Sequence, residues 1–295
     1  MALPEEELLQ IRDMATLERV VQGCTRCGLR AGCRGVVFGD GNPRARLMLI
    51  GEGPGADEDR LGRPFVGRAG QLLDRILAAC GFNRQRHVYI ANIVKCRPPG
   101  NRTPTPDERA ACLPNLRAQM RLVNPVIVVL LGSTALQALI DPAARITRAR
   151  GRWIHKDGIW YMPTYHPAAL LRNPSLKREC WHDFKLVIDK YRELVDPHHE
   201  SPHYPLAEAA AAAAREPDEP APGRAPEPGA GRGGGRAAGG IAAGAGAAAG
   251  GGSTAGVPAP EGAGEPLTEQ LTLFQDDFLP GEAFRGPAGG QEEPA

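Results

Sequence analysis

Short runs of apolar residues recur along the first two thirds of the chain, at Ala45–Gly51, Val88–Val94, Val126–Gly132 and Ile159–Tyr165. Their apolarity is continuous rather than alternating, which is typical of strands that are covered on both faces in a parallel sheet. Between them, apolar residues follow helical spacing. The clearest helical patterns cover residues 67–80, 105–123, 133–140 and 176–194.

Strands and helices alternate along the chain, and this alternation predicts the α/β class. We expect a three-layer αβα sandwich around a central four-stranded, mainly parallel sheet. Ligands of such sheets bind beyond the carboxyl ends of the strands. Residues that directly follow the strands are therefore the first candidates for function.

The distribution of glycine and proline divides the chain. The sequence has 37 Gly and 28 Pro, and the stretch from Ser201 to about Gly264 is mostly Ala, Gly, Pro and Glu. Such a stretch has too little apolar side chain to offset the entropy of ordering it. We therefore predict a folded domain over residues 1–195, a disordered linker over 196–265 and an acidic tail over 266–295.

Charge separates along the same boundary. Residues 1–195 hold 30 Lys and Arg against 19 Asp and Glu, whereas residues 196–295 hold 5 against 15. A basic folded domain suits a polyanion, of which nucleic acid is the common one. A solvated basic surface without a partner is the alternative.

Several classes of protein do not fit the sequence. No apolar run approaches the ~18–20 residues of a membrane-spanning helix, and the acidic first residues lack the features of a signal peptide. The seven cysteines are an odd number, so metal ligands or free thiols are favoured over a disulfide framework. We expect a monomeric, cytoplasmic protein of bacterial type that is associated with the nucleoid.

Unusual residues lie at the ends of the first two predicted strands. The loop with Gly51, Gly53 and Gly55 lets the backbone approach a ligand closely, although a structural turn explains it equally well. Farther along this loop, Phe65 can stack on a planar ligand or plug the core. Asn92 presents a donor and an acceptor that suit the edge of a base, but loop backbone can take the same bonds.

The fourth predicted strand leads into His166, and then into Leu170, Leu171 and Arg172. A histidine at a strand end, taken alone, is more often structural than catalytic. An exposed apolar pair beside an arginine suits a wedge that enters a stacked duplex. A loop packed on the core is the alternative.

The cysteines form a spaced set. Cys24 and Cys27 make a C-x₂-C pair, Cys96 follows the second strand, and Cys112 lies on the next helix. Four thiolates can hold zinc or an iron–sulfur cluster, and spacing alone does not separate the two. Cys33 is a rival ligand because it is close to the pair in sequence.

Three segments together resemble the family 4 uracil-DNA glycosylases, the iron–sulfur branch of that superfamily: GEGPGADEDRLGRPFVGRAGQLL, YIANIVKCRPPGNRTPTPDE and YHPAALLRNP. With the cysteine pair, the resemblance covers about residues 20–195. It implies an enzyme that hydrolyses the N-glycosidic bond of uracil in DNA and so starts base excision repair. The runner-up hypothesis is a non-catalytic DNA-binding iron–sulfur adapter that is tethered to the sliding clamp.

The resemblance implies roles for single residues. Phe65 would stack on uracil, Asn92 would read its polar edge, and His166 would donate to O2 as charge builds on the departing base. Backbone groups of Gly51–Gly55 would line the pocket. Glu58 would crowd the C5 side of the ring, where thymine carries its methyl group.

By the same resemblance, Leu170 and Leu171 would form the wedge, and Arg172 would grip phosphates. The sequence departs from the best-known branch of the superfamily, in which the first motif supplies an Asp that positions the attacking water. Gly53 stands at that place. We hypothesise that Glu52, together with backbone groups, orients the water instead.

The resemblance also favours a structural [4Fe–4S] cluster on Cys24, Cys27, Cys96 and Cys112. In the tail, the sequence Gln270-Leu271-Thr272-Leu273-Phe274 resembles the short peptide by which bacterial repair and replication proteins dock to the sliding clamp. Its Gln can bond to pocket backbone, while Leu and Phe fill an apolar groove. A chance apolar patch in a disordered tail is the alternative.

Overall fold

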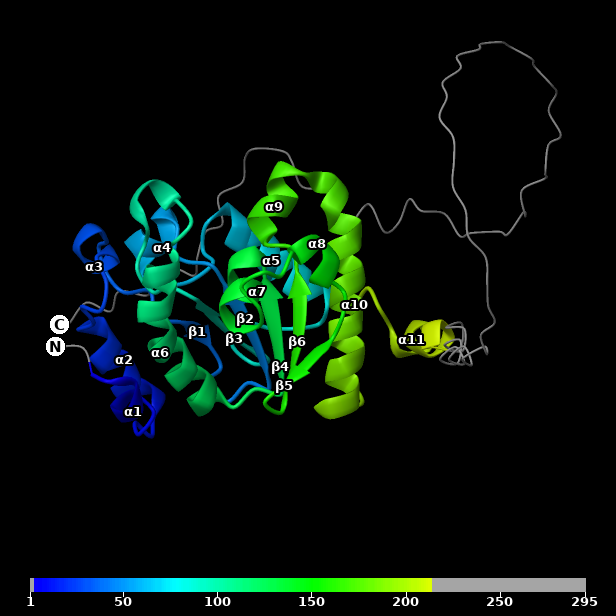
Figure 1. Ribbon diagram of the computed structural model, residues 1–295. Helices are drawn as coiled ribbons and strands as arrows, with labels where there is room; N and C mark the ends of the chain where they lie inside the picture. The colour runs from blue at the N-terminus through cyan, green and yellow to red at the C-terminus, as the bar shows by residue number, and fades with distance from the viewer. Residues whose placement is uncertain (1–2, 214–295) are drawn as a thin grey trace, which may run out of the picture. The chain divides into compact units, whose positions relative to one another are not determined.

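The computed structural model describes residues 3–213 (Figure 1). The predicted linker after residue 213 and the clamp-like peptide at residues 270–274 lie outside the described residues. Within residues 3–213, the structure contains no helix that is both long and apolar enough to span a membrane.

A six-stranded sheet with the order β1-β3-β2-β4-β6-β5 forms the central layer. Its middle strands are parallel and match the four predicted runs to within two residues: β2 (Leu47–Gly51), β3 (Val88–Asn92), β4 (Ile127–Leu131) and β6 (Ile159–Thr164). The predicted α/β class and αβα arrangement are confirmed.

The predicted number of four strands is wrong, because the sheet gains an antiparallel strand at each edge. These are β1 (Asp40–Gly41), which pairs with β3, and β5 (Ile154–Lys156), which pairs with β6. Both strands are very short and partly exposed, so no continuous apolar run announces them.

Helices cover both faces of the sheet (Figure 1). The helices in the described residues are α1 (Glu5–Leu8), α2 (Met14–Gln22), α3 (Leu29–Gly32), α4 (Ala56–Leu61), α5 (Arg68–Ala79), α6 (Pro106–Val123), α7 (Ser133–Leu139), α8 (Ile146–Ala149), α9 (Pro167–Arg172), α10 (Lys177–Leu194) and α11 (Leu206–Ala213). A capping box opens α6: Thr105 Oγ1 accepts from the Glu108 N–H, and the Glu108 carboxylate accepts from the Thr105 N–H.

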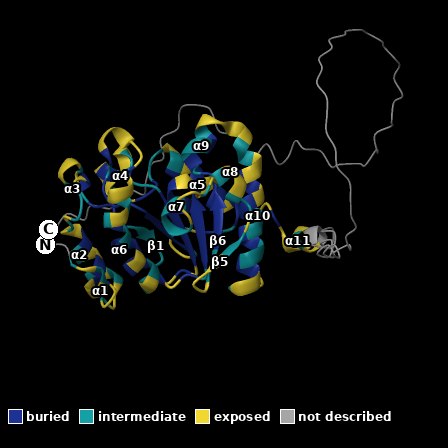
Figure 2. Cartoon of the chain, viewed as in Figure 1, coloured by how far each residue is buried: buried dark blue, intermediate teal, exposed yellow. Residues whose placement is uncertain are grey.

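The core has two halves, one on each side of the sheet. Met48 and Ile50 belong to a buried cluster with residues of α2, α6 and α7. Leu49 and Phe184 are buried outside that cluster, and α10 packs on β4 and β6 at this second face. Figure 2 shows the central strands mostly buried and the helices buried along one side, as a three-layer fold requires.

The ordered fold extends past the predicted domain boundary at residue 195. The His199 ring stacks on Phe82 with 4.5 Å between centroids, and Ser201 Oγ donates to the Ala79 carbonyl at 3.0 Å. Tyr204 is also buried. Composition did not reveal this extension because the segment after residue 195 contains few apolar residues. Its contacts are mainly aromatic stacking and hydrogen bonds.

Candidate active site and cysteine cavity

A cavity of about 710 Å³ lies at the carboxyl ends of the parallel strands. Phe65, Asn92 and His166 all line it, so the three residues on which the functional hypothesis depends face a common hollow, as expected. The other predicted site residues in its lining are Glu52, Gly53, Gly55, Glu58 and Arg172. Gly51, Leu170 and Leu171 are not part of the lining.

Asn92 ends β3 at the floor of this cavity. Its side chain is almost fully buried, and its Oδ1 atom has no hydrogen-bond partner among residues 3–213. A buried polar atom left without a partner costs about 1–3 kcal/mol. Such a group is suited to a ligand that brings a donor. Gly51 makes room for it, because a Cβ there would lie 2.6 Å from Asn92 Oδ1 and 2.5 Å from the Phe65 ring.

Phe65 adopts a left-handed backbone conformation, with φ of +54°. This conformation is uncommon for a bulky residue and stores of order 1–3 kcal/mol of strain, which the surrounding structure must hold. The ring is buried and lies 5.5 Å from the His166 ring, with 30° between their planes. One wall of the cavity is therefore an aromatic face next to an imidazole.

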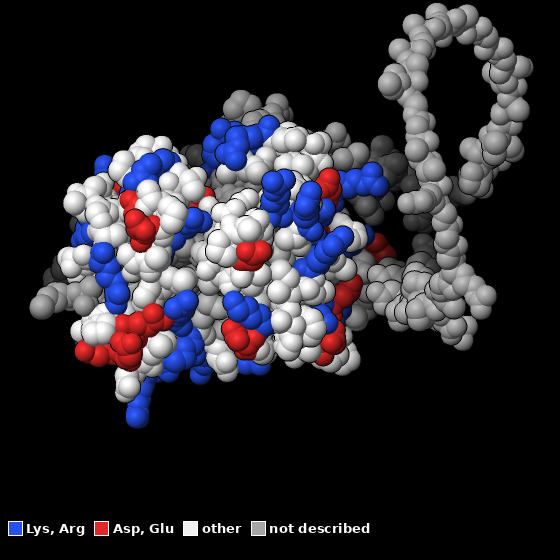
Figure 3. All heavy atoms as spheres, in the orientation of Figure 1, with Lys and Arg blue, Asp and Glu red and all other residues white. Residues whose placement is uncertain are grey.

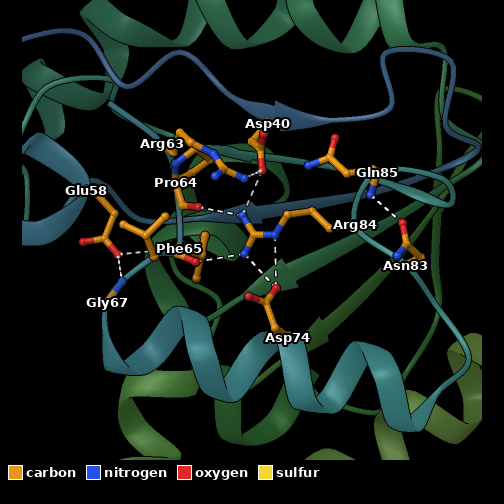
Figure 4. Close-up of polar contacts among 11 residues, drawn as sticks. Asp40, Glu58, Arg63, Pro64, Phe65, Gly67, Asp74, Asn83, Arg84 and Gln85 are labelled. Carbon is orange, nitrogen blue, oxygen red and sulfur yellow. Dashed lines mark hydrogen bonds and ion pairs between the residues drawn. The ribbon is translucent and has the colours of Figure 1, made fainter. Parts of the chain in front are cut away.

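Glu58 ties together the two loops that surround Phe65. One carboxylate oxygen accepts from the N–H groups of Val66 and Gly67, each at 2.9 Å (Figure 4). The other accepts from the Gly55 N–H at 3.1 Å. The side chain therefore links the backbone directly after Phe65 to the loop that follows β2.

His166 is the N-terminal cap of α9. Its Nδ1 accepts from the Ala168 N–H at 3.1 Å, so the neutral ring carries its proton on Nε2. Burial, helped by the charge of Arg172, lowers the pKa of His166 to about 4, although Glu58 opposes this shift. At neutral pH the residue is thus an uncharged imidazole with one available N–H donor.

Glu52 follows β2, and its carboxylate accepts a hydrogen bond from Thr134 Oγ1 at the start of α7. Thr134 is buried and lines the same cavity. Thr134 was not among the predicted site residues. Its position, two residues after a predicted strand, is the signal that indicated the other site residues and could have indicated Thr134.

The predicted wedge pair does not lie in an exposed loop. Leu170 and Leu171 are both in α9, and the Leu170 side chain is fully buried. The expectation that both leucines are exposed is therefore wrong for Leu170. The cause is helical geometry, which directs Leu170 toward the core and leaves Leu171 half-buried and Arg172 exposed.

Exposed arginines surround α8 and α9. Figure 3 shows Lys and Arg side chains gathered over this part of the molecule, whereas acidic side chains gather over α1. The exposed residues are Arg145, Arg148, Arg152 and Arg172, of which Arg172 also lines the cavity. The cavity thus opens beside a basic surface.

A second, small cavity is lined by the four cysteines that the sequence analysis assigned as ligands: Cys24, Cys27, Cys96 and Cys112. Cys33, the rival ligand, is not part of this lining, although its thiol contacts both Arg30 and the Cys96 side chain. Burial raises the pKa of the Cys27, Cys96 and Cys112 thiols. A metal that binds there would have to displace their protons.

Hydrogen-bond donors surround this second cavity. The Lys95 N–H points at the Cys112 sulfur at 3.3 Å, and the Asn115 amide lies 3.7 Å from the Cys24 sulfur. Hydrogen bonds to the sulfurs are typical of iron–sulfur sites. Within residues 3–213, no three His, Cys, Asp or Glu side chains are arranged to hold a single metal ion. A cluster is larger than one ion, so its thiolates need not converge on a point.

Comparison with known proteins identifies relatives of this chain. The model of the family described as the uracil DNA glycosylase superfamily matches residues 38–185. A type-4 uracil-DNA glycosylase of Thermotoga maritima is 48% identical over 174 residues, which cover 58% of this chain and 86% of the relative.

Two archaeal proteins with the same description are also similar. That of Archaeoglobus fulgidus is 40% identical, over 57% of this chain and 88% of the relative. That of Pyrobaculum aerophilum is 38% identical, over 60% of this chain and 93% of the relative. The range that the family model matches, residues 38–185, contains the residues that line the cavity described above.

Proposed function

Because the chain belongs to the uracil-DNA glycosylase superfamily, we propose that it is a type-4 enzyme that hydrolyses the N-glycosidic bond of uracil in DNA. The observation that carries the proposal is the shared cavity of Phe65, Asn92 and His166, with the Asn92 Oδ1 atom left without a partner in the described part of the chain. A base inside the duplex cannot reach this cavity, so the nucleotide must first leave the stack.

Recognition of uracil rests on two residues. The Phe65 ring stacks on the flat face of the base, which contributes ~1–3 kcal/mol in comparable base–aromatic contacts. The Asn92 amide reads the polar edge, and its unpartnered Oδ1 accepts from the N3–H of uracil. Cytosine has no N–H at this position, so it would leave the buried acceptor unsatisfied.

Departure of the base is aided by His166. As the bond breaks, negative charge builds on the uracil ring, and the Nε2–H donates to O2. A well-placed donor of this kind contributes ~3–4 kcal/mol to the stabilisation of a developing anion. The Ala168 N–H holds the opposite nitrogen and so keeps the proton on the side of the ring that donates.

The attacking water is oriented by Glu52, and Thr134 holds the Glu52 carboxylate. We expect Glu52→Gln to slow uracil release. Thr134→Val should slow it about tenfold, whereas Thr134→Ser retains the hydroxyl and the rate. In a Glu52→Gln background, Thr134→Val should add no further loss. Full activity of Glu52→Gln, beside loss of activity in His166→Ala, would contradict this role.

DNA is held outside the cavity. Arg172 and the arginines around α8 bind phosphates. Leu171 is the wedge residue, because Leu170 is buried and not available.

Glu58 lies beside C5 of the base in this proposal. Three backbone N–H groups hold its carboxylate in place, so it disfavours the thymine methyl group.

Cys24, Cys27, Cys96 and Cys112 would hold a [4Fe–4S] cluster. These cysteines would thereby join the segment between α2 and α3 to the segments that flank the loop after β3. Purified protein that lacks iron–sulfur absorbance and carries stoichiometric zinc would contradict this assignment.

Gln270, Leu271, Leu273 and Phe274 dock to the sliding clamp, and the long preceding segment serves as the tether. Leu273→Ala combined with Phe274→Ala should abolish capture of the full chain by immobilised clamp. Unchanged capture would contradict the clamp partner. We infer a cytoplasmic location, at the chromosome, from these partners.

The activity is tested with a uracil-containing oligonucleotide. The full chain should convert it to a product that alkali cleaves at the abasic site, and an identical oligonucleotide with thymine should stay intact. His166→Ala and Asn92→Ala serve as controls for contaminating activity. DNA binding without any cleavage would instead support the non-catalytic adapter.

A further inference from the structure

Arg84 lies in the loop before β3 and does not line the cavity, yet it bonds to the backbone of the loop that does. Its Nη1 donates to the Pro64 carbonyl and its Nη2 to the Phe65 carbonyl, each at 2.8 Å (Figure 4). The Arg84 side chain is 11% exposed. These bonds are therefore well shielded from water.

The guanidinium is itself held by two further elements. Asp74 of α5 accepts from Nε at 3.1 Å and from Nη2 at 2.8 Å, and Asp40 of β1 accepts from Nη1 at 3.1 Å. Although burial alone would raise it, the pKa of Asp40 is lowered by hydrogen bonds from Arg63 and Arg84. Because a guanidinium presents its donors in a rigid planar fork, these contacts fix the direction of the bonds to the two carbonyls.

The Phe65 backbone needs such a restraint. Its φ of +54° is disfavoured for a residue with a side chain, so a free loop would leave this conformation. From the other side the backbone is confined by α5, where a Cβ on Gly70 would lie 2.0 Å from the Phe65 carbonyl carbon and oxygen. Arg84 and Gly70 thus confine the Phe65 peptide between them.

We propose that Arg84 is a positioning residue for uracil excision: its bonds to the Pro64 and Phe65 carbonyls hold Phe65 in the left-handed conformation that places its ring in the cavity wall. This inference rests on the proposed function. Arg84 does not touch the substrate. Its loss leaves the ring free to leave the stacking position, while the phosphate-binding arginines around α8 and α9 are unchanged.

The chain offers a matched control in Arg63. Its Nη2 pairs with the same Asp40 carboxylate at 3.0 Å, and its side chain is 54% exposed. Replacing Arg63 removes a charge and an ion pair from the same network. The substitutions to compare are therefore Arg84→Met, Arg84→Lys and Arg63→Met, all in the full chain.

Two quantities separate positioning from general damage. The first is the single-turnover rate of uracil release from a single-stranded oligonucleotide. The second is the affinity for the same oligonucleotide with an abasic analogue, which has no base to stack. Arg84→Met and Arg84→Lys should lower the rate about tenfold or more, and Arg63→Met less than about twofold. Abasic affinity should stay constant in all three.

A third comparison uses the Phe65→Ala background, in which Arg84→Lys should cause no further loss of rate. The inference is overturned if Arg84→Lys cleaves like Arg63→Met, if abasic affinity falls as much as the rate, or if the losses add in that background. If Arg84→Met fails to fold, the comparison of Arg84→Lys with Arg63→Met tests the inference. Absence of cleavage by the unsubstituted chain would contradict the proposed function itself.

Discussion

At the scale of single residues, the cavity contains a buried polar atom that has no hydrogen-bond partner among the described residues. Asn92 is buried at the end of a fully buried strand, and no described residue bonds to its Oδ1. A residue retained for stability would have a partner. Asn92 therefore carries a cost that only binding of a ligand offsets.

This cost predicts opposite effects of one substitution on stability and on activity. Asn92→Leu has a similar size and removes the unpartnered acceptor, so the melting temperature should stay constant or rise. Uracil release should fall about a hundredfold or more, because the polar edge of the base loses its partner. Thermal unfolding and single-turnover cleavage of the same preparation check both halves. A large loss of stability would mean that Asn92 is a structural residue.

His166 predicts a pH dependence of stability. Its pKa in the folded protein is about 4, well below the ordinary value of 6.5. Between these values the unfolded chain binds a proton that the folded protein does not, so the free energy of unfolding falls as the pH is lowered from about 6.5 to about 4. His166→Gln should unfold with a weaker dependence over that window. If the free energy of unfolding falls equally with pH in the two proteins, His166 does not titrate as described.

At the scale of elements, the sequence pattern predicts the strands that are buried along their whole length. It does not predict the strands that form only through contacts with a neighbouring strand. The strands from Leu47, Val88, Ile127 and Ile159 were predictable because both of their faces are covered. The edge strands were not predictable. Their few residues pair by backbone hydrogen bonds, which impose no pattern on the side chains.

The same limit applies to the site. Asn92 and His166 were predicted because each is a polar residue at the end of an apolar run, and Phe65 because it is an aromatic residue in a loop rich in Gly and Pro. Arg84 was not predicted, since an arginine in a polar loop is common, and only its hydrogen bond to the Phe65 carbonyl in the fold draws attention to it. Thr134 had a signal in its position after a predicted strand, but its hydrogen bond to Glu52 is visible only in the fold.

Helix α9 separates two leucines that look alike in sequence. Leu170→Ala removes a fully buried side chain and should destabilise the protein by about 2–5 kcal/mol. Leu171→Ala removes a half-buried one and should change stability by less than about 0.5–1 kcal/mol, yet slow uracil release from duplex DNA more than from single strands. Denaturant unfolding and paired cleavage assays measure these effects. An equal slowing on both DNA forms would contradict the wedge role of Leu171.

At the scale of the whole molecule, the basic surface lies beside the candidate active site. Residues 1–195 carry an excess of 11 positive charges, and exposed arginines gather around α8 and α9, beside the cavity (Figure 3). Binding of DNA to this surface releases counterions, so its strength must fall steeply with salt. The sequence predicts the net charge but not that these arginines lie beside the cavity, because the cavity forms only in the fold.

The cysteine cavity joins segments that are distant in the chain. Cys24 and Cys27 lie between α2 and α3, whereas Cys96 and Cys112 belong to the segments around the loop after β3. A cluster bound there restrains the N-terminal helices beyond their own apolar contacts, as any cross-link between distant segments does.

Loss of the proposed cluster should therefore loosen the N-terminal helices before it loosens the sheet. In a Cys24→Ser, Cys27→Ser variant, we expect loss of iron and earlier trypsin cleavage within residues 3–36, where arginines are frequent. The segment from β2 to α10 should resist for longer, because its parallel strands are fully buried. Mass spectrometry of the first fragments identifies the order of cleavage. A Cys33→Ser variant is the control and should retain iron and the wild-type pattern, because Cys33 does not line the cavity. Equal resistance of the double variant and the wild type would mean that apolar packing alone holds these helices.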